Sequence, residues 1–123
     1  DEARDLLKGR CAIVNVWRPI RGPLLSAPLA LCDAGSILRE DLVAARMVYP
    51  HRTGEEFRSA HSPRHRWYYY PRMAEDEAVL IKVYDSATDG PARFSLHSAF
   101  DDPTTPPDVP PRESIEARTL VFY

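Results

Sequence analysis

The chain has little glycine, little cysteine and no long apolar run, and it carries almost no net charge. Its 123 residues include five glycines and two cysteines, and 16 lysines and arginines stand against 18 aspartates and glutamates. A net charge of -2 provides no basic field for nucleic acid or an anionic membrane. No apolar stretch approaches the roughly 18 residues of a membrane span, and the N-terminus does not resemble a signal peptide. We therefore expect a soluble, cytoplasmic protein with no nucleic-acid or membrane partner.

The two cysteines, Cys11 and Cys32, are too few for a disulfide framework. Their spacing also does not form the Cys-x-x-Cys pair of a zinc or redox site. We expect both to be reduced, structural thiols.

Proline is abundant where glycine is scarce, with 12 prolines in the chain. Proline interrupts helices and central strands, so this frequency excludes a helical bundle and favours short strands joined by loops. At 123 residues the chain forms a single domain, residues 1–123, large enough to bury about two thirds of its unfolded surface.

Short β-branched and aromatic segments alternate with these proline-containing loops. The expected strands are residues 11–17, 29–33, 66–70, 78–84, 93–100 and 113–123. Helical pattern is confined to residues 1–9 and to a turn within 36–43, a hairpin or loop is expected around 51–54, and 57–65 reads as a polar connection. This order predicts a mainly β protein, an antiparallel barrel or jelly roll with a short N-terminal helix.

The last expected strand separates polar from apolar residues with a period of two. The polar face consists of Arg112, Ser114, Glu116 and Arg118. Residues of opposite parity are largely apolar, and Glu116 is expected to form ion pairs with its arginine neighbours. In a barrel the polar face could line a liganded interior.

His97 lies on the preceding expected strand, 15 residues before Arg112. An imidazole on one strand and an Arg-x-Ser on the next can together form a binding site. The imidazole can bind non-haem iron while the guanidinium and hydroxyl hold a carboxylate beside it. By spacing alone the pattern is weak, because a lone strand histidine is more often a structural or surface residue.

Several sequence blocks, in order through nearly the whole chain, are similar to the fungal hydroxylase/desaturase family. The blocks are residues 15–20 (Asn-Val-Trp-Arg-Pro-Ile), 28–33, 65–69, 84–86, 97–103 and 111–116. That family is related to the cephem methoxylase subunit, the gibberellin desaturases and the endoperoxide-forming oxygenases. The resemblance implies a double-stranded β-helix, a cupin-like jelly roll, and an Fe(II)- and 2-oxoglutarate-dependent dioxygenase of secondary metabolism acting on a small lipophilic metabolite.

The resemblance also implies roles for individual residues. His97 falls where the family has its distal iron ligand, and the 2-oxoglutarate clamp is either Arg112 with Ser114 or Arg118. We favour Arg112 for its Arg-x-Ser form, although a loop with five prolines makes its separation from His97 unusually long. Asn15 and Trp17 could line the pocket from a neighbouring strand.

The chain departs from the family in one respect, since a facial triad needs two histidines and a carboxylate and the family supplies two of these as His-x-Asp. Here the residues two positions after the four histidines are Thr53, Pro63, Trp67 and Ala99. We therefore expect a C-terminal portion of a jelly-roll oxygenase, a fragment inactive alone that binds neither Fe(II) nor 2-oxoglutarate by itself. The alternative is a catalytically dead binding or partner subunit. Exposed strand edges would offer a route to homo- or hetero-oligomers.

Overall fold

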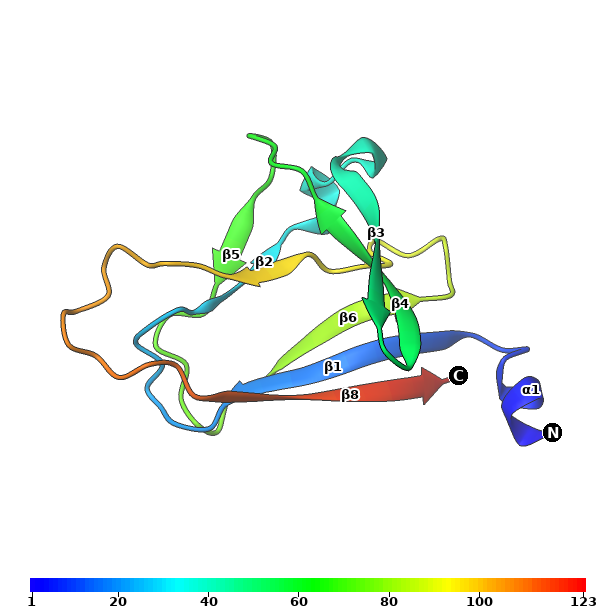
Figure 1. Cartoon of the computed structure of the whole chain (residues 1–123), viewed down its shortest axis with the longest axis horizontal. Helices are drawn as coiled ribbons and strands as arrows, with labels where there is room; N and C mark the ends of the chain where they lie inside the picture. The colour runs from blue at the N-terminus through cyan, green and yellow to red at the C-terminus, as the bar shows by residue number, and fades with distance from the viewer.

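The computed structural model describes residues 1–123, and β-strands dominate it (Figure 1). The elements are α1 (Glu2–Leu6), β1 (Cys11–Pro19), β2 (Leu29–Cys32), β3 (Leu42–Tyr49), β4 (Arg52–Ser59), β5 (Trp67–Tyr69), β6 (Val79–Asp85), β7 (His97–Ala99) and β8 (Ser114–Phe122). Two 3-10 turns, Ala34–Ser36 and Arg39–Asp41, stand where one helical turn was expected. The mainly β class is confirmed.

The strands form two three-stranded antiparallel sheets and one hairpin. One sheet has the order β6-β1-β8, and the other has the order β5-β2-β7. Figure 1 shows the second group of strands lying over the first. Most neighbours in these sheets are far apart in sequence, since β1 pairs with β6 along one edge and with β8 along the other.

A small apolar core joins the two sheets. It contains Trp17 of β1, Leu29 of β2 and Ile81 of β6, with further contributions from two loops, and Leu31 packs against it. Ile81 is only 1% exposed. Because these side chains come from both sheets, the sheet faces that carry them are the inner faces of the molecule.

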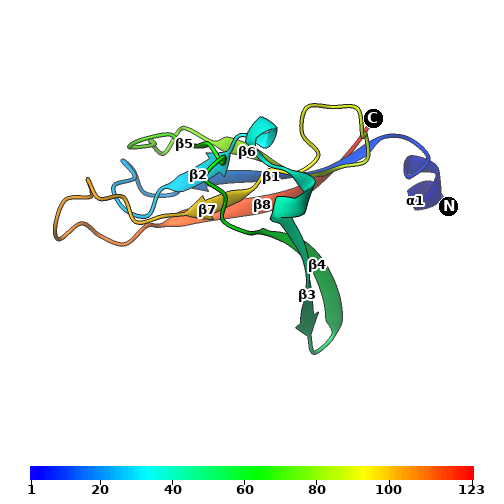
Figure 2. The same ribbon diagram turned by 90° about the horizontal axis from the view of Figure 1, so that it is seen from above.

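The β3–β4 hairpin projects away from the two sheets (Figure 2). Residues 57–65 were expected to be a polar connection, and this was wrong for their first part, because β4 extends to Ser59. The strand forms by pairing with β3 along its whole length rather than by burial. A polar sequence can adopt this structure because most of a projecting hairpin is solvated, and only Phe57 near its base packs against another ring, that of Phe94.

A buried carboxylate holds the base of this hairpin. Asp41 accepts hydrogen bonds from the backbone N–H of Leu38 (2.9 Å) and from Arg64 (3.3 Å), and it contacts His65 Nε2 at 3.1 Å. These contacts lower the pKa of Asp41 below its usual value, the Leu38 hydrogen bond most of all. Its own carbonyl accepts from Ala60 N, so one residue ties both ends of the hairpin together.

A second buried carboxylate, Asp85, lies at the C-terminal end of β6 in the β6-β1-β8 sheet. Asp85 receives Arg10 Nη2 at 2.7 Å and Lys82 Nζ at 3.0 Å, and its side chain is 3% exposed. The hydrogen bond from Arg10, and then that from Lys82, lowers the pKa of Asp85 well below its ordinary value of 3.8. The ion pair of Arg10 and Asp85 fixes the segment before β1 against the end of β6.

β7 is shorter than the expected strand. The segment 93–100 was expected to be a strand, but only His97–Ala99 pairs, because Ser95 N bonds to Lys82 O and draws the preceding residues toward β6. Both cysteines are free. None of the helices is long and apolar enough to span a membrane.

Candidate functional site

The polar face of β8 lies on the inner side of its sheet. In the register of β1 and β8, Arg118 is opposite Asn15 and Glu116 is opposite Trp17. Asn15 and Trp17 are 2% and 4% exposed. Directly opposed residues of an antiparallel pair project from the same face of the sheet, so the polar residues of β8 share the face of Asn15 and Trp17, where Glu116 and Arg118 remain exposed to solvent.

His97 lies on the inner side of the other sheet. It is opposite Leu31, whose side chain packs against the core. His97 Nδ1 is 2.8 Å from the carbonyl oxygen of Ser95. A carbonyl oxygen only accepts, so Nδ1 carries the proton and the lone pair of the neutral ring is on Nε2. This is the tautomer and second-atom hydrogen bond that metal-binding histidines require.

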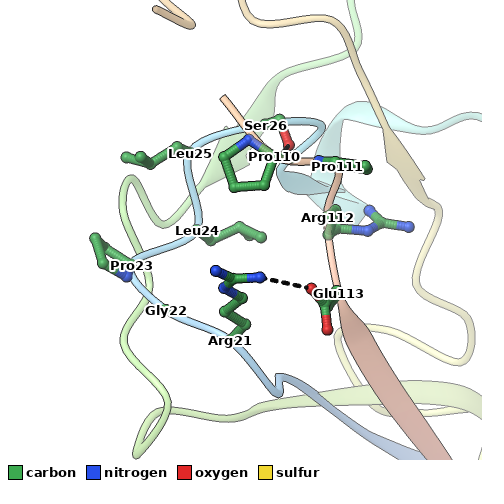
Figure 3. A pocket seen from close by; sticks show the side chains of 10 residues that line it. All are labelled: Arg21, Gly22, Pro23, Leu24, Leu25, Ser26, Pro110, Pro111, Arg112 and Glu113. Atoms are coloured by element: carbon green, nitrogen blue, oxygen red, sulfur yellow. Dashed lines mark hydrogen bonds and ion pairs between the residues drawn. The ribbon is translucent and has the colours of Figure 1, made fainter. Parts of the chain in front are cut away.

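Arg112 stands just before β8, beside the loop between β1 and β2. Its Nη1 donates to the carbonyl oxygen of Ala27 at 2.8 Å, and its guanidinium lies 5.8 Å from the centre of the Trp17 ring. In Figure 3 its side chain points away from the neighbouring ion pair of Arg21 and Glu113. Arg112 is half-buried and forms no ion pair with a carboxylate of the chain, so its charge is available to an anionic ligand.

Arg118, Asn15 and Glu116 form a polar network across β1 and β8. Arg118 Nε donates to Asn15 Oδ1 at 3.2 Å, and Asn15 Nδ2 donates to Glu116 Oε1. The expectation that Glu116 forms ion pairs with its arginine neighbours was wrong, because the buried amide of Asn15 takes both partners. The terminal nitrogens of Arg118 are left without a carboxylate. Asn15 therefore positions Arg118 and Glu116. The sequence had indicated only that Asn15 could line the pocket.

The residues present do not by themselves fit a non-haem iron centre. No group of three histidine, cysteine, aspartate or glutamate side chains comes together in the chain. His97 supplies one imidazole of the three ligands that a facial triad needs. The donor set suits a dicarboxylate better, since Arg112 and Arg118 are unpaired cations and Ser114 offers a hydroxyl on the same face.

Comparison with known proteins gives consistent matches over the whole chain. Residues 1–122 match a family profile described as an oxidoreductase/YMDC permease-like domain. Aspirochlorine biosynthesis protein N of Aspergillus oryzae is 43% identical over 126 residues, covering 100% of this chain and 52% of that protein. Hydroxylase/desaturase CTB9 of Cercospora beticola is 42% identical and is covered over 40% of its length.

A solved structure matches equally well. The iron and alpha-ketoglutarate-dependent endoperoxidase NvfI superimposes with a TM-score of 0.91 at 38% sequence identity, over 99% of this chain and 46% of that protein. This match confirms the expected jelly-roll fold. The chain spans about half the length of the relatives it matches.

Proposed function

Because the chain belongs to the oxidoreductase/YMDC permease-like domain family, together with fungal hydroxylase/desaturases and Fe(II)/2-oxoglutarate-dependent dioxygenases, we propose that it forms one half of such an oxygenase site. The substrate is a small lipophilic metabolite, and the reaction is a hydroxylation or desaturation. The main support for the proposal is the tautomer of His97. Its Nδ1–H donates to Ser95 O, which leaves Nε2 free on the inner face.

The clamp for 2-oxoglutarate is Arg112 with Ser114. A guanidinium binds a carboxylate through two parallel hydrogen bonds, and a hydroxyl on the next inward position adds a third donor. Arg112 keeps donors free beyond its one bond to Ala27 O, and it lies against Trp17, which limits the access of water to the pair. Arg118 stands farther along the same face and is the alternative clamp.

His97 is a single metal ligand. The chain contributes this imidazole to a centre whose other two ligands come from outside the residues described here. What the chain's own residues do is orient the imidazole through Ser95 O and bind the cosubstrate carboxylate.

The experiment is a chimera in which this chain replaces the matching region of the solved endoperoxidase. We expect the chimera to form succinate from 2-oxoglutarate with Fe(II), and His97→Ala to abolish it. His51→Ala, which removes an exposed histidine from the β3–β4 turn, is the matched control and should leave turnover unchanged. Full turnover in His97→Ala would refute the proposal. A folded chimera that binds 2-oxoglutarate without turnover would favour the binding or partner subunit.

A further inference from the structure

His97 follows a short segment, residues 93–96, that joins the two sheets. Ser95 N donates to a carbonyl oxygen of β6 at 2.9 Å, and Leu96 O accepts from a backbone N–H of β2 at 2.9 Å. The chain therefore passes from one sheet to the other between these two bonds. Ser95 O lies between them along the chain, and it is the atom that His97 Nδ1 contacts at 2.8 Å.

The ring of Phe94 packs between the hairpin and β6. Its centre lies 5.1 Å from the ring centre of Phe57 of β4, in an edge-to-face arrangement, and 6.3 Å from that of Tyr84 of β6. Two guanidinium groups extend this cluster, with Arg39 5.1 Å from the centre of the Phe57 ring and Arg93 5.3 Å from that of Phe94. Edge-to-face rings and cations over ring faces attract each other beyond their burial, so the cluster holds Phe94 in place.

We propose that Phe57 is a positioning residue for His97 and acts through Phe94. The joining segment is held at Arg93, whose Nε donates to the carbonyl oxygen at the end of β6 at 2.9 Å, and again at Ser95 N. Phe94 lies between these two points, so the packing of its ring fixes the backbone from which Ser95 O projects. The inference rests on the proposed function only in taking His97 as a metal ligand.

The contact with Ser95 O determines both the orientation and the tautomer of the imidazole. A carbonyl oxygen held in place keeps the proton on Nδ1 and leaves the lone pair on Nε2 pointing in one direction. If the carbonyl group is displaced, the ring is free to rotate and its proton exchanges between the two nitrogens. The β3–β4 hairpin pairs with neither three-stranded sheet, and yet it influences a side chain of the β5-β2-β7 sheet.

The first test measures the tautomer of His97 in the metal-free chain. Nitrogen NMR shifts of the ring distinguish Nδ1–H from Nε2–H at about pH 8.5, where an ordinary histidine is neutral. We expect the unchanged chain to be almost wholly Nδ1–H. Phe57→Leu and Phe94→Leu each keep an apolar side chain and remove one ring of the pair. Because an aromatic pair is worth enough to shift an equilibrium about two- to tenfold, each should raise the Nε2–H population by this factor.

Two variants control for the ring and for the hairpin. Tyr49→Leu removes another aromatic ring of the hairpin, one that lies 4.5 Å from the Arg52 guanidinium, and should not change the tautomer. Phe57→Tyr keeps the ring and should keep Nδ1–H. Amide exchange in β1 should be the same in every variant. An unchanged tautomer in both Phe57→Leu and Phe94→Leu overturns the proposal. A change as large in Tyr49→Leu, or one with fast exchange throughout β1, also overturns it, because Phe57 would then stabilise the fold as a whole.

The second test separates this inference from the proposed function. In the chimera without oxygen, Phe57→Leu should raise the Fe(II) concentration needed for the charge-transfer band about two- to tenfold. The 2-oxoglutarate requirement at saturating Fe(II) should not change, because the clamp lies on another sheet. A band lost in His97→Ala, with Phe57→Leu no different from Tyr49→Leu, overturns the inference alone. A band kept in His97→Ala overturns the proposed function, and the tautomer then decides whether Phe57 positions the ring.

Discussion

At the scale of single residues, the choice between Arg112 and Arg118 as the clamp is open to direct measurement. In the chimera, Arg112→Ala should weaken 2-oxoglutarate binding by about 2–5 kcal/mol, because it leaves the cosubstrate carboxylate without its charged partner. Arg118→Ala should have a smaller effect. The measurement is turnover against 2-oxoglutarate concentration. A steep rise in the requirement for Arg118→Ala with none for Arg112→Ala would reverse the assignment.

The sequence predicted which residues of β8 are polar and share a face, because a period of two follows from strand geometry alone. It did not predict what they bond to. The partner of Glu116 is Asn15, 101 positions away, and this contact depends on the pairing of β8 with β1. The tautomer of His97 could not be predicted from the sequence either, since it depends on the contact between Ser95 O and Nδ1.

At the scale of elements, Asp41 should determine how firmly the β3–β4 hairpin is held. Asp41→Ala removes the acceptor for Leu38 N, Arg64 and His65 together. We expect amides at the base of the hairpin, such as those of Leu38 and Ala60, to exchange about tenfold faster or more, while the core strands change little.

Glu56→Ala is the control for this prediction. Its carboxylate bonds only to Arg58 on the exposed hairpin, so amide exchange at the base should not change. Unchanged exchange in Asp41→Ala would show that the strands alone hold the hairpin in place.

β1, β2, β5, β6 and β8 lie where the pattern of apolar and aromatic residues indicated, but β3 was missed although its sequence, Leu-Val-Ala-Ala-Arg-Met-Val-Tyr, is largely apolar. β4 was not predictable either, because Arg-Thr-Gly-Glu-Glu-Phe-Arg-Ser has no apolar face and forms a strand through its partner β3. β7 is shorter than its pattern. Leu96 O still accepts from Cys32 N of β2, but Ser95 N bonds to Lys82 O of β6, so the residues before Leu96 do not pair with β2. Order within the sheets came only from the structure, since non-local pairing leaves no mark in a local pattern.

At the scale of the whole molecule, Asp85 should make stability depend on acid. Its pKa is lowered in the folded chain, so its ionised form stabilises the fold above the ordinary value of 3.8, and this contribution is lost as pH falls below that value. We expect Asp85→Asn to lower the melting temperature clearly at about pH 6, and the difference from the unchanged chain to shrink towards about pH 3.

Glu113→Gln is the matched control for the acid dependence. Glu113 pairs with Arg21 at the surface, where both side chains are at least half exposed, so the change should be small at every pH. A difference for Asp85→Asn that stays constant with pH would show that the carboxylate acts through packing rather than charge.

We propose that the inner faces of β7 and β8 carry one half of an Fe(II)/2-oxoglutarate site. The most direct measurement is the charge-transfer absorption of Fe(II) and 2-oxoglutarate, titrated without oxygen into the chimera and its His97→Ala and Arg112→Ala variants. We expect a saturable band in the chimera, a higher 2-oxoglutarate requirement for Arg112→Ala, and no band for His97→Ala. An unchanged band in His97→Ala, with the same 2-oxoglutarate requirement, would show that these faces do not form the site.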